Sequence, residues 1–438
     1  MNNIQPVSDS FLCSNCGACK SICSKGAISM SLSSMGRMYA SVNDNCIDCG
    51  LCIKVCPSLN RSLVEDSYIG CINSVFTGRT TDEKIFMNAQ SGGVCTAILK
   101  YLLENHKIDC AIVCRMSFGE TPIVESMVVE DISQLYTTQK SCYTPVDMLS
   151  QLRNVKNKKS VAFVGLPCHI QGLIHLQQIS KSYQNVKYKL GLMCDRTLCG
   201  GIQDVFVAKA KQLGVKSSFF KMDWRRKAFT TNGNFYSYEH APVVVYTKSE
   251  EYVIPNVYRF LLKDFFTSPR CRVCEDKINT SADIVLGDPW RMKNVEMRYG
   301  ESVIITRTTK GDELIQEMKQ GGMLKLIRRV NSEVIHGQLI NERRLSVATY
   351  SKAFHVLPVS VNSYLLDRPE DISVSDKEKD KCERDFLNFL SLEKKTKKEV
   401  VSMALNMIER YERIQGNPFY HFLSRVRNKI IFMLKRYK

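Results

Sequence analysis

The amino-acid sequence predicts a protein of the α/β class, α+β overall, with a small cysteine-rich domain at its N-terminus. Eight of its nineteen cysteines are gathered in two runs between residues 13 and 56. Beyond about residue 70, segments with strand patterning alternate with segments of helical periodicity, which is typical of a domain built on a mixed sheet. A chain of 438 residues is long enough for both parts and for a further C-terminal segment.

The composition is that of a globular protein, with 44% hydrophobic and 24% charged residues. The first twelve residues lack the basic region and apolar run of a secretory signal. No segment approaches the run of about eighteen apolar residues that predicts a membrane span. We therefore expect a cytoplasmic protein whose many cysteines, odd in number, serve metal or redox chemistry rather than disulfides.

Residues 1–65 carry the ligand pattern of two iron–sulfur clusters. Each run has the spacing C-x2-C-x2-C-x3-C, in which the first three thiolates hold one cubane and the fourth completes the other. The first [4Fe–4S] cluster is predicted to be held by Cys13, Cys16, Cys19 and Cys56. The second is predicted to be held by Cys46, Cys49, Cys52 and Cys23.

This pattern predicts a bacterial-type 2[4Fe–4S] ferredoxin domain. Residues 27–42, between the two runs, alternate apolar and polar around Met35 and Gly36, which indicates a small hairpin. The alternative is a pair of zinc sites. Zinc usually takes two well-separated CxxC pairs, whereas each run here already holds four cysteines at ferredoxin spacing.

The larger domain is predicted from its alternating elements. Helices are expected at 91–107, 169–179 and 201–213. Strands are expected at 108–116, 160–166, 186–194, 284–286 and 303–306. Cys168 and Cys194 fall at the carboxyl ends of two of these strands, where ligands bind in such sheets. Together with the loop pair Cys271 and Cys274 they form a candidate third four-sulfur site, for either an iron–sulfur cluster or zinc.

These blocks together resemble a known family, the coenzyme F420 hydrogenase/dehydrogenase beta-subunit proteins. The resemblance covers roughly residues 5–340 and is carried by residues 91–97, 164–173, 191–194, 271–274 and 282–290. It implies a flavin, FAD, and one [4Fe–4S] cluster held by Cys168, Cys194, Cys271 and Cys274. It divides the larger domain into an N-terminal part, 66–155, and a C-terminal part, 156–350.

Six residues are candidates for binding the flavin. Ser91, Gly92 and Gly93 open a predicted helix whose free N–H groups suit a pyrophosphate, although such a segment can also be a plain helix cap. Lys140 and Ser141 resemble the family's Lys-Ser-x-Tyr stretch, in which the lysine would stabilise the reduced ring; a solvated surface lysine is the alternative. The resemblance also implies that Asp288 lies in the cofactor pocket; a simple turn residue is the alternative.

Catalytic residues are not assigned, but Lys140 and His169 are candidates. His169 follows Cys168, and both proton transfer and helix packing remain open for it. Cys199 is close enough in sequence to Cys194 to substitute for a ligand. The remaining cysteines of the larger domain are expected to be core thiols: Cys71, Cys95, Cys110, Cys114 and Cys142.

The formal net charge of +17 would favour nucleic acid as a partner. It counts every cysteine as neutral, however. Because a [4Fe–4S] cluster with its four thiolates carries about −2, three clusters would remove about six charges. We therefore expect no nucleic-acid partner.

Residues 373–438 form a charged helical tail outside the resemblance. From His421 onward it has six basic and no acidic residues together with an apolar set. Such a segment suits peripheral contact with an anionic membrane at its inner face, or a helix docked on the protein or a partner.

The sequence thus predicts an iron–sulfur flavin-dependent oxidoreductase. Electrons would pass from a ferredoxin-like redox protein through two N-terminal clusters and a third cluster to FAD, and then to a small-molecule substrate, coenzyme F420 or another. The alternative is a non-catalytic electron-transfer subunit that delivers electrons to a partner enzyme.

Overall fold

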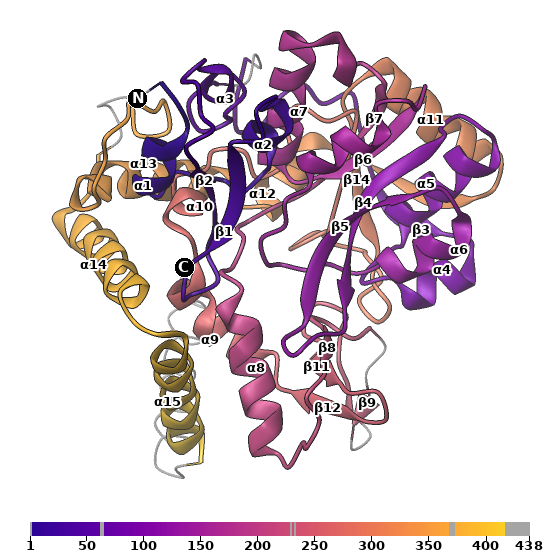
Figure 1. The fold of residues 1–438 in the computed structure, drawn as a ribbon. Helices are drawn as coiled ribbons and strands as arrows, with labels where there is room; N and C mark the ends of the chain where they lie inside the picture. Colours follow the sequence, from indigo (N-terminus) through magenta and orange to yellow (C-terminus); the bar gives the residue numbers. More distant parts are fainter. Residues whose placement is uncertain (1, 62–64, 228–229, 232–233, 368–372, 417–438) are drawn as a thin grey trace.

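An eight-stranded mixed sheet forms the centre of the molecule (Figure 1). The computed structural model of the chain describes residues 2–61, 65–227, 230–231, 234–367 and 373–416. The strand order in the sheet is β15-β3-β14-β13-β7-β6-β4-β5. The strands are β3 (Ser74–Thr80), β4 (Cys110–Ser117), β5 (Ile123–Val129), β6 (Val161–Gly165), β7 (Val186–Leu192), β13 (Ile284–Gly287), β14 (Ser302–Thr306) and β15 (Leu324–Arg329).

The sheet is mixed, as the sequence predicts. Strands β4, β6, β7 and β13 are parallel to one another, whereas β5, β14, β3 and β15 pair antiparallel with their neighbours. Because β6 and β7 are adjacent and parallel, the segments that follow them leave the sheet at the same edge. This places Cys168 and Cys194 near each other.

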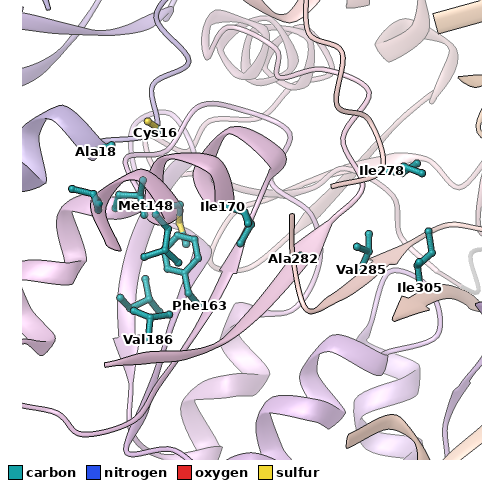
Figure 2. Close-up of a cluster of buried hydrophobic side chains, with 14 of the residues drawn as sticks. Cys16, Ala18, Met148, Phe163, Ile170, Val186, Ile278, Ala282, Val285 and Ile305 are labelled. Atoms are coloured by element: carbon teal, nitrogen blue, oxygen red, sulfur yellow. The ribbon is translucent and has the colours of Figure 1, made fainter. Parts of the chain in front are cut away.

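Helices cover both faces of the sheet. Helix α5 (Val94–Glu104) packs through Ile98 and Leu102 on one face, and α7 (Pro167–Ile179) packs on the other. The apolar core under α7 continues into the N-terminal domain. Figure 2 shows Cys16 and Ala18 close to Met148 and Ile170 of this core. The N-terminal domain and the larger domain therefore share this hydrophobic core.

The N-terminal domain contains the predicted hairpin. Strands β1 (Ile28–Leu32) and β2 (Met38–Val42) pair antiparallel, and Gly36 has the positive φ of 74° that its turn requires. The turn lies against the start of α8 (Gly201–Gln212): Gly200 N–H donates to Gly36 O over 2.8 Å. A side chain at Gly36 would place its Cβ 2.5 Å from Gly201 N. This glycine therefore permits the close approach of the two domains.

A second, smaller sheet was not expected from the sequence. Strands β8 (Lys221–Asp223), β11 (Val243–Tyr246) and β12 (Glu251–Ile254) form it, and β9 (Thr230–Thr231) pairs with β10 (Asn234–Phe235). It packs with α8 in a separate hydrophobic cluster that contains the fully buried Trp224. Its strands are too short and too close to basic residues to give a clear period in the sequence.

The remaining helices connect and cover these sheets. The helices are α1 (Gln5–Asp9), α2 (Ala18–Ile22), α3 (Leu51–Lys54), α4 (Glu83–Asn88), α6 (Ile132–Leu135), α9 (Val257–Phe266), α10 (Pro269–Arg272), α11 (Thr309–Gln320), α12 (Asn331–Gly337), α13 (Ile340–Ala353), α14 (Asp376–Glu393) and α15 (Lys397–Gln415). The 3-10 helices are η1 (Tyr136–Thr138), η2 (Leu149–Val155), η3 (Lys181–Tyr183) and η4 (Phe354–Val356).

The C-terminal region is helical up to residue 415, as predicted. Capping boxes begin both of its helices, Ser375 with Glu378 at α14 and Thr396 with Glu399 at α15. Figure 1 shows α15 alongside α8. The basic stretch from His421 onward lies outside the described residues. Among the described helices, none combines the length and apolarity needed to cross a bilayer.

Candidate iron–sulfur sites

The first predicted thiol set is gathered inside the N-terminal domain. Cys16, Cys19 and Cys56 are all buried, and Cys13 is half-buried. Burial, with Cys13 nearby, raises the pKa of Cys16 to about 11. Burial, with Cys16 and Cys13 nearby, raises the pKa of Cys56 to about 12. The pKa of Cys19 is raised by burial and by Cys13, Cys16 and Cys56 in turn. Three buried thiols that resist ionisation, each influenced by Cys13, fit a site in which cationic iron offsets the charge of the thiolates.

The second predicted set lies towards the surface. Cys49 is exposed, Cys46 and Cys23 are half-buried, and Cys52 is buried. Burial raises the pKa of Cys52, and Cys46 contributes to the increase. Cys23 ends α2, and its sulfur accepts from Ala27 N–H over 3.3 Å. The two N-terminal sets are therefore asymmetric, one enclosed and one accessible.

The third predicted set comes together from three distant segments. Cys168 is the second residue of α7, Cys194 follows β7, Cys271 lies in α10 and Cys274 follows that helix. Burial raises the pKa of Cys194, and Cys271 and Cys274 add to the increase. The pKa of Cys168 is raised by burial and also by Cys194 and Cys274. Cys199, by contrast, is buried among apolar residues and its backbone N–H is bonded to Phe266 O.

A buried arginine completes the surroundings of the third set. Arg270 is only 3% exposed, and its Nε donates to Ser58 Oγ over 2.9 Å. Among the described residues it forms no ion pair with a carboxylate. Its electrostatic partners are Cys274 and Cys168, which raise its pKa against the lowering effect of burial. A buried guanidinium without a carboxylate partner is costly, so this cation fits an anionic group held by the four thiolates.

The first and third sets adjoin each other. Cys168 Sγ lies 3.9 Å from Ser14 O, between two cysteines of the first set. A Cβ on Gly172 would stand 3.4 Å from Cys16 Sγ, so α7 passes directly against that sulfur. Cys16 also contributes to the raised pKa of Cys168. A small cavity beside them is lined in part by Cys168, Cys274 and Arg270.

The predicted cofactor residues lie in three places around one segment. Lys140 Nζ lies 2.6 Å from Asp223 Oδ2, and Asp288 Oδ2 lies 2.5 Å from a guanidinium nitrogen of Arg225. Near Ser91, Lys227 Nζ donates to the Ser91 carbonyl over 2.5 Å.

The segment 223–227 begins at the end of β8, and its first, third and fifth residues each contact one predicted cofactor residue. The residues contacted are Lys140, Asp288 and Ser91, in that order. The segment was not predicted from the sequence. The only signal that could have indicated it is the cluster of charged residues around Trp224.

The glycine pair and Ser141 contact protein groups. A Cβ on Gly92 would lie 2.4 Å from Gly78 O, so this glycine allows its loop to pack against β3. Gly93 has a φ of 74° at the start of α5. Ser141 Oγ accepts from Gln90 Nε2 over 3.0 Å. Together with Lys140 and Asp223, Ser141 lines a second cavity.

His169 is buried and neutral. It is 1% exposed, and its Nδ1 accepts from Leu166 N–H over 3.2 Å at the start of α7. Burial lowers its pKa to about 4. This arrangement favours the helix-packing interpretation over proton transfer.

Three family models match the chain. The model of the 4Fe-4S dicluster domain matches residues 12–60. The N-terminal model of the coenzyme F420 hydrogenase/dehydrogenase beta subunit matches residues 75–153, and the C-terminal model of the same family matches residues 158–331.

Curated relatives carry related names. A coenzyme F420-dependent sulfite reductase of Methanocaldococcus jannaschii is 28% identical over 354 residues, which are 75% of this chain and 49% of that protein. The chain thus spans about half the length of this relative. A subunit of the F(420)H(2) dehydrogenase of Methanosarcina mazei is 26% identical, over 66% of this chain and 80% of that one. The beta subunit of coenzyme F420 hydrogenase from Methanosarcina barkeri is 27% identical, over 64% and 96%.

A solved structure has a similar fold. A chain of the F420-reducing [NiFe] hydrogenase complex from Methanosarcina barkeri superposes with a TM-score of 0.51 at 22% identity. The match covers 66% of this chain and 94% of the other, and it supports the mixed α/β fold.

Proposed function

Because the chain belongs to the coenzyme F420 hydrogenase/dehydrogenase beta-subunit family, we propose that it is an iron–sulfur electron-transfer subunit of an oxidoreductase complex. The observation that carries the proposal is the contact between the first and third thiol sets, with Cys168 Sγ 3.9 Å from Ser14 O. When bound, the clusters supply one-electron carriers and an FAD supplies the exchange between one- and two-electron transfer.

The chain's own residues hold these groups and keep water away from them. We assign the first cluster to Cys13, Cys16, Cys19 and Cys56, the second to Cys46, Cys49, Cys52 and Cys23, and the third to Cys168, Cys194, Cys271 and Cys274. Burial of Cys16, Cys19 and Cys56 keeps water away from the first cluster. Exposure of Cys49 leaves the second set accessible to a redox protein such as a ferredoxin.

We further propose that FAD is bound by Ser91, Gly92, Gly93, Lys140, Ser141 and Asp288. Three contacts from the segment 223–227 support this proposal, because they hold the loops of these residues together. Gly92 packs tightly against the backbone of Gly78 in β3, and this contact fixes the position of its loop. The ion pair of Lys140 with Asp223 holds the lysine side chain at the cavity wall.

A substrate-reducing oxidoreductase is the second candidate. The cavity lined by Lys140, Ser141 and Asp223 favours it, since a small molecule could reach that wall. The relatives' names suggest coenzyme F420 as one such substrate. Turnover with a small molecule distinguishes this candidate from a pure electron-transfer subunit, since both are proposed to bind FAD.

Anaerobic purification followed by iron, sulfide and flavin quantification tests the proposal. We expect about twelve irons and one FAD per chain. The variant Cys194→Ala should lose about four irons and keep the N-terminal signals. Cys199→Ala is the matched control and should keep all of them. Eight irons without flavin would overturn both the third cluster and the FAD assignment, while four irons or fewer would overturn the N-terminal assignment.

A further inference from the structure

Two cysteines outside the three thiol sets lie in contact. Cys114, on β4, and Cys142, in the segment between η1 and η2, have their sulfurs 3.9 Å apart. They are 28 residues apart in the chain, so this contact is made by the tertiary structure. Cys142 is 8% exposed and Cys114 is half-buried. Both are expected from the sequence to be core thiols, and nothing in their spacing predicts that they meet.

One member of the pair stands at the wall of the second cavity. Cys142 lines it together with Met116, Lys221 and Asp223. The thiol of Cys142 is hydrogen-bonded to Cys114, and this bond lowers the pKa of Cys114. Cys114 is also the more exposed of the two residues. It is therefore the attacking thiol of the pair.

A third cysteine nearby, Cys95, does not compete with Cys114 as the attacking thiol. Burial raises the pKa of Cys95 to about 12, and Cys114 adds to the increase. Cys95 therefore remains a protonated thiol under conditions in which Cys114 ionises. It serves as a matched control, since it lies in the same neighbourhood without a thiol hydrogen bond among the described contacts.

The geometry permits the two sulfurs to bond. A disulfide has its sulfurs about 2.05 Å apart, so they must approach by roughly 1.9 Å. A change of χ1 moves a cysteine sulfur by about 2 to 3 Å. The loop of Cys142 is itself anchored: Gln90 Nε2 donates to Ser141 Oγ over 3.0 Å and to Tyr143 Oη over 3.1 Å. Closure therefore requires side-chain rotation within a loop that the protein already holds in place.

We propose that Cys114 and Cys142 form a redox-active thiol pair that closes reversibly to a disulfide, with a low-molecular-weight disulfide as the oxidant. Cys114 thiolate attacks one sulfur of the incoming disulfide, whose S–S bond breaks and releases one thiolate. The thiolate of Cys142 then attacks Cys114 sulfur, and the mixed disulfide releases the second thiolate. The protein pair loses two electrons, the incoming disulfide gains them, and the two protons end on the two released thiols.

This inference is independent of the proposed electron-transfer function. It needs neither a cluster nor a flavin, because both steps take place between sulfurs of the pair and of the incoming molecule. In the reverse direction, two small thiols reopen the pair. Loss of iron from a preparation would therefore test the proposed function and leave this inference unchanged.

The test uses the anaerobically purified full-length holoprotein and oxidised glutathione as the probe. The protein is equilibrated with glutathione at several ratios of disulfide to thiol, alkylated, and digested for mass spectrometry. We expect a Cys114–Cys142 linked peptide, with loss of alkylation at both positions, that returns to free thiols on addition of dithiothreitol. In Cys142→Ser, the expected product is one glutathione adduct at Cys114. Cys95→Ser should behave as wild type.

Two controls keep the outcome decisive. Chain denatured before the same treatment shows any linkage that arises by random exchange, and the visible spectrum of each variant shows that it retains its folded state. Absence of the linked peptide at every glutathione ratio would overturn the proposal, as would a glutathione adduct at Cys142 with Cys114 unmodified. An equal yield of linkage in Cys95→Ser and wild type, absent from the denatured chain, would support it.

Discussion

Removing the charge of Arg270 should lower the reduction potential of the cluster proposed at the third site. Arg270 is 3% exposed, forms no carboxylate ion pair among the described residues, and interacts with Cys274 and Cys168. Reduction adds a negative charge to the group held by those thiolates. A buried cation beside it therefore favours the reduced form, and Arg270→Gln removes that preference.

The magnitude follows from Coulomb's law. A unit charge about 4 Å from another interacts by about 4 kcal/mol at an effective dielectric constant of about 20. The added electron is shared over a cluster whose other atoms are farther away, so we take roughly half, about 2 kcal/mol. Since about 2.3 kcal/mol corresponds to 100 mV for one electron, the expected decrease is about 90 mV.

A redox titration followed by electron paramagnetic resonance measures this change. The third-site signal is identified as the one lost in Cys194→Ala, and the N-terminal signals in the same sample serve as an internal reference. Arg270→Lys keeps the charge but loses the planar donor to Ser58, so its potential should fall by less than half as much. An unchanged potential in Arg270→Gln, with the third-site signal present, would refute the reasoning.

Three further predictions concern stability. Gly92→Ala should lower the free energy of unfolding by about 1 to 3 kcal/mol in chemical denaturation, because its Cβ would meet backbone at 2.4 Å, whereas Gly200→Ala meets its nearest atom at 3.4 Å and should change it less. Arg37→Met should cost about 1 to 3 kcal/mol, because the half-buried Glu393 carboxylate loses its ion-pair partner and keeps only the hydrogen bond from Ser33 Oγ; Arg37→Met with Glu393→Met should recover part of that loss, and equal stability of the single and double variants would contradict this. Burial lowers the pKa of Lys227 to about 7, below its unfolded value of about 10.4, so its contribution to stability is fully present above pH 10.4 and is lost as the pH falls towards 7. Unfolding of Lys227→Met measured from pH 10 to 7 should lack this decline of about 1.4 kcal/mol per pH unit, and an identical slope in both proteins would contradict the assignment.

Local patterns predicted five of the eight strands of the large sheet, missed β3, β5 and β15, and predicted none of the smaller sheet. The segment 160–166 is an apolar run and 186–194 combines apolar residues with two lysines, and the structure has β6 and β7 there. Strands β8 and β12, by contrast, are three and four residues long. Their apolar side chains pack mainly against α8 and Trp224, so tertiary contacts rather than a local period define them.

The C-terminal helices illustrate a second limit. Dense charge predicts a helical tail over 373–438, and the structure has two helices among its described residues, at Asp376–Glu393 and Lys397–Gln415, each beginning with a capping box. The pattern does not indicate where they pack. Phe386, fully buried between Tyr350 and Phe354, anchors α14, and the ion pair of Arg37 with Glu393 ties this helix to the N-terminal hairpin.

By itself, the sequence determined the two N-terminal candidate ligand sets, because two-residue gaps between cysteines turn successive sulfurs towards one point. It also determined the class of the sheet, through apolar runs that can be satisfied only by burial on both faces. Only the tertiary structure decided the placing of Arg270 beside Cys274, the three contacts of the segment 223–227, and the meeting of Cys114 with Cys142. Each of these depends on segments brought together by strand order and packing, and no local spacing records such distances.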